Sequence, residues 1–107
     1  MFRGDVWEVQ FPNPIGTRPA VLLTTNPLIS RLGAVTVVEV TGTEGPSMTH
    51  VEVDLASGLT GRDRSWVNAT GVHTVSKGKL RTHRGRLTST ELRRVSDAVR
   101  LYLDLDH

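Results

Sequence analysis

The order of patterns along the chain constrains its fold most: short strand-like segments come first, and a helical pattern appears only at the end. Residues 6–11 alternate apolar and polar side chains, which is the period of a half-buried strand. Residues 19–25 begin with a proline and continue as an apolar run, which predicts a central strand. The valine-rich residues 34–41 predict a third strand. This part of the chain therefore predicts a sheet.

Further strands are predicted downstream. Residues 49–55 alternate between polar and apolar side chains, so this strand has one solvent-facing side. Residues 65–69 predict a fifth strand, and a short basic strand is predicted near residues 83–87. A helical turn is expected at residues 28–32, and the glycine-bearing residues 57–63 predict a loop.

The C-terminal segment has the signals of one amphipathic helix. Thr88 is a good N-cap, and Glu91 three residues later completes a capping box. One apolar stripe follows at helical spacing, made by Leu92, Val95, Val99 and Tyr102. The expected fold is therefore mainly β (α+β), with a small, strongly bent antiparallel sheet capped by a C-terminal helix.

Length and composition narrow the class of protein. The 107 residues leave room for one compact core, so we expect residues 1–107 to form a single domain. The chain has no cysteine, which excludes disulfides and thiolate metal sites. Its apolar runs are too short to span a bilayer and its N-terminus lacks an apolar signal core, so we expect a cytoplasmic protein with no membrane partner.

The charge is distributed unevenly although the formal net charge is only +2. Residues 77–86 contain no acid, whereas most of the acids lie elsewhere. The basic side chains of this segment are Lys77, Lys79, Arg81, His83, Arg84 and Arg86. Such a polarised surface attracts polyanions, which indicates contact with nucleic acid. The alternative is a solvated basic face without a ligand.

Arg18 stands between Thr17 and Pro19, at the entrance to the second predicted strand. The proline fixes the backbone there, so a permanently charged guanidinium is held at the start of a strand. Its fork of N–H donors suits an oxyanion such as a phosphate or a carboxylate. The alternative is an arginine that only keeps a strand edge soluble.

The ordered set of short motifs resembles the MazF/PemK family. The matching segments are Arg3-Gly4-Asp5-Val6-Trp7, Arg18-Pro19-Ala20-Val21-Leu22 with Asn26 after it, Val38-Glu39-Val40-Thr41, His50-Val51, and Gly85-Arg86-Leu87 before Thr88-Ser89-Thr90-Glu91-Leu92. Together they span nearly the whole chain.

The resemblance implies a toxin of a type II toxin–antitoxin pair with an SH3-like barrel and a C-terminal helix. It implies a homodimer that cleaves single-stranded RNA as a metal-independent endoribonuclease, without a cofactor, and a cognate antitoxin whose tail blocks the RNA groove. The arginine before the proline of the second strand is Arg18, and the threonine ending the third strand is Thr41. These two are the predicted catalytic residues.

The residue types suit this chemistry except for one step. RNA brings its own nucleophile, the 2′-hydroxyl, so the site needs to hold and neutralise the phosphate, which Arg18 and Thr41 can do. Neither is a good general base near neutral pH, whereas histidine is. Of the four histidines, His50 is expected on a polar strand face and His107 at a frayed end. We therefore expect His73 to assist RNA binding or proton transfer.

Other RNA-binding candidates follow from position and charge. Trp66 lies near a loop and is a candidate for base stacking or for the core. Trp7 alternates with apolar residues and is expected in the core or a dimer interface. The remaining candidates are Asn26, Lys77, Lys79, Arg81, Arg84 and Arg86.

Two departures from the family pattern bear on specificity. Residues 12–17 make a first loop several residues shorter than is usual, and Gly71-Val72-His73-Thr74 stands where relatives often have Gln-Ile-Arg-Thr. Two alternatives stay open: a CcdB-like gyrase-binding toxin of the same fold, and a non-catalytic SH3-like binding module. A metal-dependent nuclease is not indicated, because no histidines and carboxylates show ligand spacing.

Overall fold

The computed structural model describes residues 1–54 and 64–105. The predicted loop at residues 57–63, the last residue of the fourth predicted strand (Leu55) and His107 lie outside the described residues.

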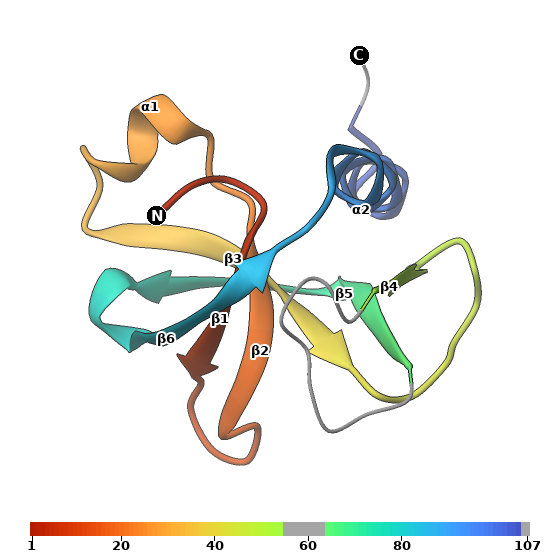
Figure 1. Cartoon of the computed structure of the whole chain (residues 1–107), viewed down its shortest axis with the longest axis horizontal. Helices are drawn as coiled ribbons and strands as arrows, with labels where there is room; N and C mark the ends of the chain where they lie inside the picture. Colours follow the sequence, from red (N-terminus) through yellow and green to blue (C-terminus); the bar gives the residue numbers. More distant parts are fainter. Residues whose placement is uncertain (55–63, 106–107) are drawn as a thin grey trace.

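One six-stranded antiparallel sheet forms most of the structure (Figure 1). Its strands are β1 (Asp5–Gln10), β2 (Thr17–Leu22), β3 (Ala34–Thr41), β4 (His50–Val53), β5 (Ser65–Ser76) and β6 (Leu80–Arg86). Short helical segments, α1 (Asn26–Ile29) and η2 (Lys77–Lys79), connect strands, and α2 (Ser89–Tyr102) ends the fold. The mainly β fold with a C-terminal helix is confirmed.

The strand order is β4-β5-β3-β2-β1-β6, so β4 and β6 are the two edges. The sheet is therefore not closed into a barrel by strand pairing in the described part of the chain. The predicted central position of the second strand is confirmed, since β2 lies between β1 and β3.

Successive residues of each strand point to opposite faces of the sheet, and each face carries its own apolar cluster. Under α2, Val21, Val38 and Val40 pack with Val95 and Val99 of the helix. The opposite face carries the second cluster, formed by Val9, Phe11, Ala20, Leu22, Ile29, Val35, Val37 and Leu80. Because α2 packs mainly against β4 and β5, the second face is free of the long helix.

Several element bounds differ from the sequence patterns: β2 begins two residues before the predicted strand of residues 19–25 and ends three residues before its predicted end. β3 has the predicted bounds, whereas β5 continues seven residues past the predicted end at Ala69, to Ser76. Its second half mixes the strand-favouring Val72, Thr74 and Val75 with Gly71, His73 and Ser76, so the strand signal is weaker there, and pairing with β3 supplies the hydrogen bonds. α1 and β6 each begin earlier than predicted, at Asn26 and Leu80.

The predicted capping box of α2 is present in full. The Thr88 hydroxyl accepts from the Glu91 N–H at 3.1 Å, and the Glu91 carboxylate accepts from the Thr88 N–H at 2.9 Å. The apolar stripe is correct for Val95 and Val99 but wrong for Tyr102, which is 49% exposed. Tyr102 is the last residue of the helix, and the buried residues of α2 are Val95, Ala98 and Val99.

Candidate active site

Arg18 and Thr41 lie at the same end of two neighbouring strands. In the pairing of β2 with β3, Ala20 is opposite Glu39. The same register continued by two residues places Arg18 across from Thr41. Both belong to the alternate set of residues that includes Ala20 and Val37, so they share the face opposite α2.

Glu39 bridges two of the predicted site residues. Its Oε2 is 2.6 Å from Nε2 of His73, and its Oε1 is 3.7 Å from Nη1 of Arg18. The Glu39 side chain is 16% exposed, compared with 29% for His73 and 46% for Arg18. Phe11 packs against the imidazole with the ring centres 4.8 Å apart. The carboxylate therefore lies between a guanidinium and an imidazole contributed by the two flanking strands.

The sequence prediction did not include Glu39 among the site residues. One signal was present: Glu39 is the only charged residue in the otherwise valine-rich segment that forms β3. A lone acid in a central strand needs a partner, because burying an unpaired charge is costly. The partner's identity depends on the register between β3 and β5, which the sequence does not reveal.

Gly71 makes room for this arrangement. A Cβ atom at this position would lie 2.9 Å from Oε2 of Glu39, closer than real side chains approach, and 3.1 Å from the Glu39 Cβ, which is a tight contact. The missing side chain at Gly71 therefore leaves the space in which the Glu39 carboxylate reaches His73.

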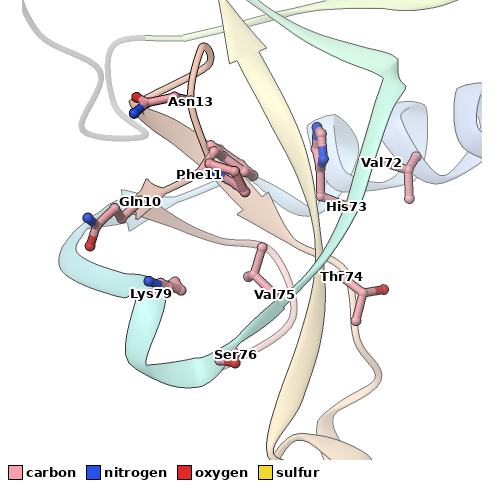
Figure 2. A pocket seen from close by; sticks show the side chains of 10 residues that line it. Gln10, Phe11, Asn13, Val72, His73, Thr74, Val75, Ser76 and Lys79 are labelled. Atoms are coloured by element: carbon pink, nitrogen blue, oxygen red, sulfur yellow. The ribbon is translucent and has the colours of Figure 1, made fainter.

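A pocket of about 680 Å³ opens beside His73 (Figure 2). It is formed by the end of β1 with the loop after it and by the second half of β5 with η2; its lining residues are Gln10, Phe11, Pro12, Asn13, Val72, His73, Thr74, Val75, Ser76 and Lys79. Figure 2 shows Lys79 and Gln10 on the opposite side of the pocket from His73. The pocket thus offers an aromatic ring, amides and a cation to a ligand, and it brings together two predicted RNA-binding residues, His73 and Lys79.

The arginines of β6 are engaged by β1. The antiparallel pairing of these strands brings each arginine beside a polar side chain: Arg81 bonds Gln10 at 2.9 Å, Arg84 bonds Glu8 at 3.0 Å and Arg86 bonds Asp5 at 2.9 Å. Two of the three partners are carboxylates. Acids of β1 therefore partly neutralise the basic residues 77–86. The sequence does not show this, because these acids and bases lie far apart along the chain. No ion pair of Lys77 or Lys79 is found within residues 1–54 and 64–105.

Asp5 binds Arg86, the last arginine of β6. Its side chain is only 3% exposed, and burial opposes its ionisation. The N–H of Phe2, the Arg86 guanidinium and the nearby His83 outweigh that cost and hold the pKa of Asp5 below its ordinary value. Asp5 is therefore a structural carboxylate that ties the N-terminus to β6.

Trp66 and Asn26 occupy structural positions. Trp66 is 7% exposed and the Arg64 guanidinium lies over its ring, so a base can stack there only if Arg64 moves. Its position speaks against the predicted stacking role. The Asn26 side-chain oxygen accepts from the backbone N–H of Arg3 at 2.7 Å, which joins the N-terminus to α1. Trp7 packs partly buried against the second apolar cluster, as expected for a core residue.

The part of the chain that the structure describes has neither a metal-binding cluster nor a membrane-spanning helix. Its residues contain no group of three or more histidine, cysteine or acidic side chains arranged to hold a metal ion. None of their helices combines the length and the apolar character that crossing a membrane requires.

Solved structures share this architecture. An endoribonuclease from a mycobacterial species, solved in complex with its cognate antitoxin, superimposes with a TM-score of 0.86 at 22% identity, covering 100% of this chain and 98% of that one. The Mycobacterium tuberculosis toxin MazF-mt6 matches with a TM-score of 0.83 at 25% identity, covering 96% and 99%. A MazE–MazF structure from Deinococcus radiodurans gives 0.80 at 18% identity, covering 99% and 97%.

Sequence comparison identifies the family. The probable endoribonuclease MazF2 of Mycobacterium tuberculosis is 30% identical over 100 residues, which cover 94% of this chain and 95% of that protein. The model of the PemK-like, MazF-like toxins of type II toxin–antitoxin systems matches residues 2–103. With the fold and this match over nearly its full length, the chain belongs to the PemK-like, MazF-like toxin family.

Proposed function

We propose that this chain is an endoribonuclease toxin that cleaves single-stranded RNA without a metal ion and is inhibited by a cognate antitoxin. The observation that carries the proposal is the position of Arg18 and Thr41, at the same end of two neighbouring strands on the sheet face free of α2. Family membership supports the same reading, because relatives are named endoribonucleases.

The two side chains supply what phosphate transfer by RNA's own 2′-hydroxyl requires. Arg18 is half exposed and can offer two N–H donors to the phosphate oxygens. The Thr41 oxygen already accepts from the Thr43 N–H at 3.1 Å, which leaves the hydroxyl proton to donate. Held in line, the 2′-oxygen displaces the 5′-oxygen and gives a 2′,3′-cyclic phosphate and a 5′-hydroxyl.

His73 is the group best suited to move a proton in this site. Histidine is the usual proton-transfer residue near neutral pH, whereas the arginine guanidinium stays protonated. His73 lies at the pocket edge and is joined to Arg18 through Glu39. We therefore assign to it proton transfer or RNA contact.

The pocket and its neighbouring lysines suggest a path for RNA. Lys79 lines the pocket and Lys77 precedes it in η2, so both can contact phosphates without breaking an ion pair of the residues that the structure describes. We propose a homodimer that acts in the cytoplasm, with RNA between the protomers, as the family resemblance implies. An acidic, partly disordered antitoxin tail is the partner whose charge suits such a groove.

Incubation of the purified protein with a long single-stranded RNA in excess EDTA tests the proposal. We expect discrete fragments with cyclic-phosphate ends, and a loss of about 10²–10³ in rate for Arg18→Ala, since one oxyanion donor is typically worth that much. Arg31→Ala is the matched control, because Arg31 is an exposed arginine just after α1.

The alternatives predict different results in the same experiment. A gyrase-binding toxin leaves the RNA intact and inhibits supercoiling. A binding module holds the RNA intact with a steep salt dependence. Intact RNA with the unmodified protein therefore overturns the proposed function, and equal cleavage by Arg18→Ala overturns the assignment of Arg18.

A further inference from the structure

We propose that Glu39 is a positioning residue for His73: it holds the imidazole through Nε2 and leaves Nδ1 to accept the proton of the 2′-hydroxyl. This inference rests on the proposed ribonuclease function and adds to it the proton-transfer machinery. The inference also gives a role to Glu39, the one charged residue of β3.

The contact geometry supports a fixed imidazole. The distance of 2.6 Å between Oε2 of Glu39 and Nε2 of His73 is that of a strong, charge-assisted hydrogen bond. Phe11 packs against the same ring, which restrains its rotation. No protein group among the described residues bonds Nδ1, so that nitrogen is available to a substrate.

Gly71 provides an independent observation. A side chain there would collide with Oε2, the same oxygen that binds His73. The pairing thus depends on three residues from two strands, Glu39 of β3 and Gly71 and His73 of β5. Gly71 leaves the space, the Glu39 carboxylate occupies it, and this carboxylate binds His73.

The chemical step balances without any added reactant. The 2′-oxygen gives its proton to Nδ1 of His73 and forms a bond to phosphorus, and the bond from phosphorus to the 5′-oxygen breaks. The leaving 5′-oxygen takes a proton from water, and His73 returns its proton to the solvent. During the step the Glu39 carboxylate faces the imidazolium that forms and stabilises it, as the acid partner of a catalytic histidine does.

Glu39 also opposes RNA binding, which separates its role from a merely structural one. Its charge lies 3.7 Å from the guanidinium that we assign to the phosphate. Glu39→Gln keeps the shape, removes the stabilising charge from the imidazolium and frees Arg18 from a competing anion. We expect its single-turnover cleavage rate to fall about 10²-fold, the lower end of what acid–base catalysis supplies, while its RNA affinity stays equal or increases.

A double-mutant cycle tests whether Glu39 acts through His73. His73→Ala should lose about the same factor of 10² as Glu39→Gln. The variant with both changes should lose little more than either alone, because the two side chains act as one unit. Additive losses would show that Glu39 acts on something else, and the proposal would then be wrong.

Gly71→Ala displaces the carboxylate without removing any functional group. The nearest colliding atom, Oε2, is the far end of a flexible side chain and can move away, whereas the 3.1 Å contact with the Glu39 Cβ requires a small shift of the strands. We expect a loss of cleavage comparable to that of Glu39→Gln in a variant that still folds, with at most a modest decrease in the melting temperature. Gly33→Ala is the control, because a Cβ there would meet nothing within 4 Å.

The outcomes separate this inference from the proposed function. Absence of cleavage by the unmodified protein overturns both. If the unmodified protein cleaves and Arg18→Ala does not, but Glu39→Gln cleaves at full speed, only the role of Glu39 is wrong. If Glu39→Gln fails to fold, Gly71→Ala and His73→Ala decide, and wild-type rates for Gly71→Ala with a displaced carboxylate overturn the proposal.

Discussion

The guanidinium carbon of Arg64 lies 4.9 Å from the centre of the Trp66 ring, and the same side chain donates to both carboxylate oxygens of Glu52, at 2.8 and 3.1 Å. The arginine is held between an acid on β4 and an indole on β5. The hydrogen bond from Arg64, assisted by its charge, lowers the pKa of Glu52, and the same pair raises the pKa of Arg64. Trp66 is covered by this contact.

From this arrangement we expect Trp66 to stabilise the fold rather than to bind RNA. Trp66→Ala should lower the free energy of unfolding by about 3 kcal/mol or more, as for other buried aromatic residues. Its affinity for a 2′-O-methyl RNA, which lacks the nucleophile, should be unchanged in the folded fraction. Urea unfolding and a binding titration measure the two effects, and a specific loss of affinity in a stable variant would restore the stacking role.

Lysines near the pocket should contribute more to RNA binding than the arginines of β6. Lys79 lines the pocket, whereas Arg84 is held by Glu8 at 3.0 Å. Lys79→Ala should reduce the slope of log affinity against log salt by about 0.7, the value for one phosphate contact on a single strand. Arg84→Ala is the comparison and should change the slope less. A larger effect of Arg84 would show that RNA displaces Glu8.

Asp5 should make stability depend on pH in the acid range. Its folded-state pKa lies below the ordinary value of 3.8, so its bonds contribute stability above that pH and lose it as the pH falls through the lower folded value. Asp5→Asn should cost about 1.5–3 kcal/mol near neutral pH, the range for hydrogen bonds to charged groups.

The same difference should be smaller at a pH below 3.8 than near neutral pH, because the unfolded chain takes up a proton there while the native carboxylate, with its lowered pKa, still resists protonation. Urea unfolding at both pH values measures it. Asp97→Asn is the control, because Asp97 is 61% exposed in its pair with Arg100 and should change stability by less than about 0.5 kcal/mol. If the stability difference between the unmodified protein and Asp5→Asn were the same in acid as at neutral pH, the role assigned to Asp5 would be contradicted.

The N-terminus of α2 should be more sensitive at Glu91 than at Thr88. Thr88→Ala removes one cap and should cost about 1 kcal/mol. Glu91 accepts from two backbone N–H groups, those of Thr88 and of Asp54, and therefore also fastens the end of β4 to the helix. Glu91→Ala should cost more than Thr88→Ala in urea unfolding, and an equal or smaller loss would show that the contact with Asp54 contributes nothing.

Local signals in the sequence were enough for elements that stabilise themselves. The valines of β3 and the capping box of α2 act within a few residues, and both predictions are confirmed. The second half of β5 has a weaker signal, because Gly71, His73 and Ser76 are mixed with valines and a threonine there, and pairing with β3 continues the strand. Long-range pairing decided that part of the fold.

The candidate site shows the same limit. Arg18 could be named from its place before the proline of an apolar strand, and Thr41 could be named through the family resemblance. Glu39 could not be joined to His73, because the contact spans 34 residues and depends on register. The side-chain bonds between β6 and β1 could not be predicted for the same reason, because Arg86 and Asp5 are 81 residues apart in the sequence.

The two faces of the sheet have a consequence for how such a toxin loses its effect. Val95 and Val99 of α2 belong to the first apolar cluster, so substitutions there reduce the amount of folded protein. Each molecule that still folds keeps an intact site. Substitutions at Arg18 or Glu39 act on the opposite face and leave abundance normal. A selection for cells that survive expression of this chain should therefore yield two separate classes of variants. One class has a low amount of active protein, and the other has a normal amount of inactive protein.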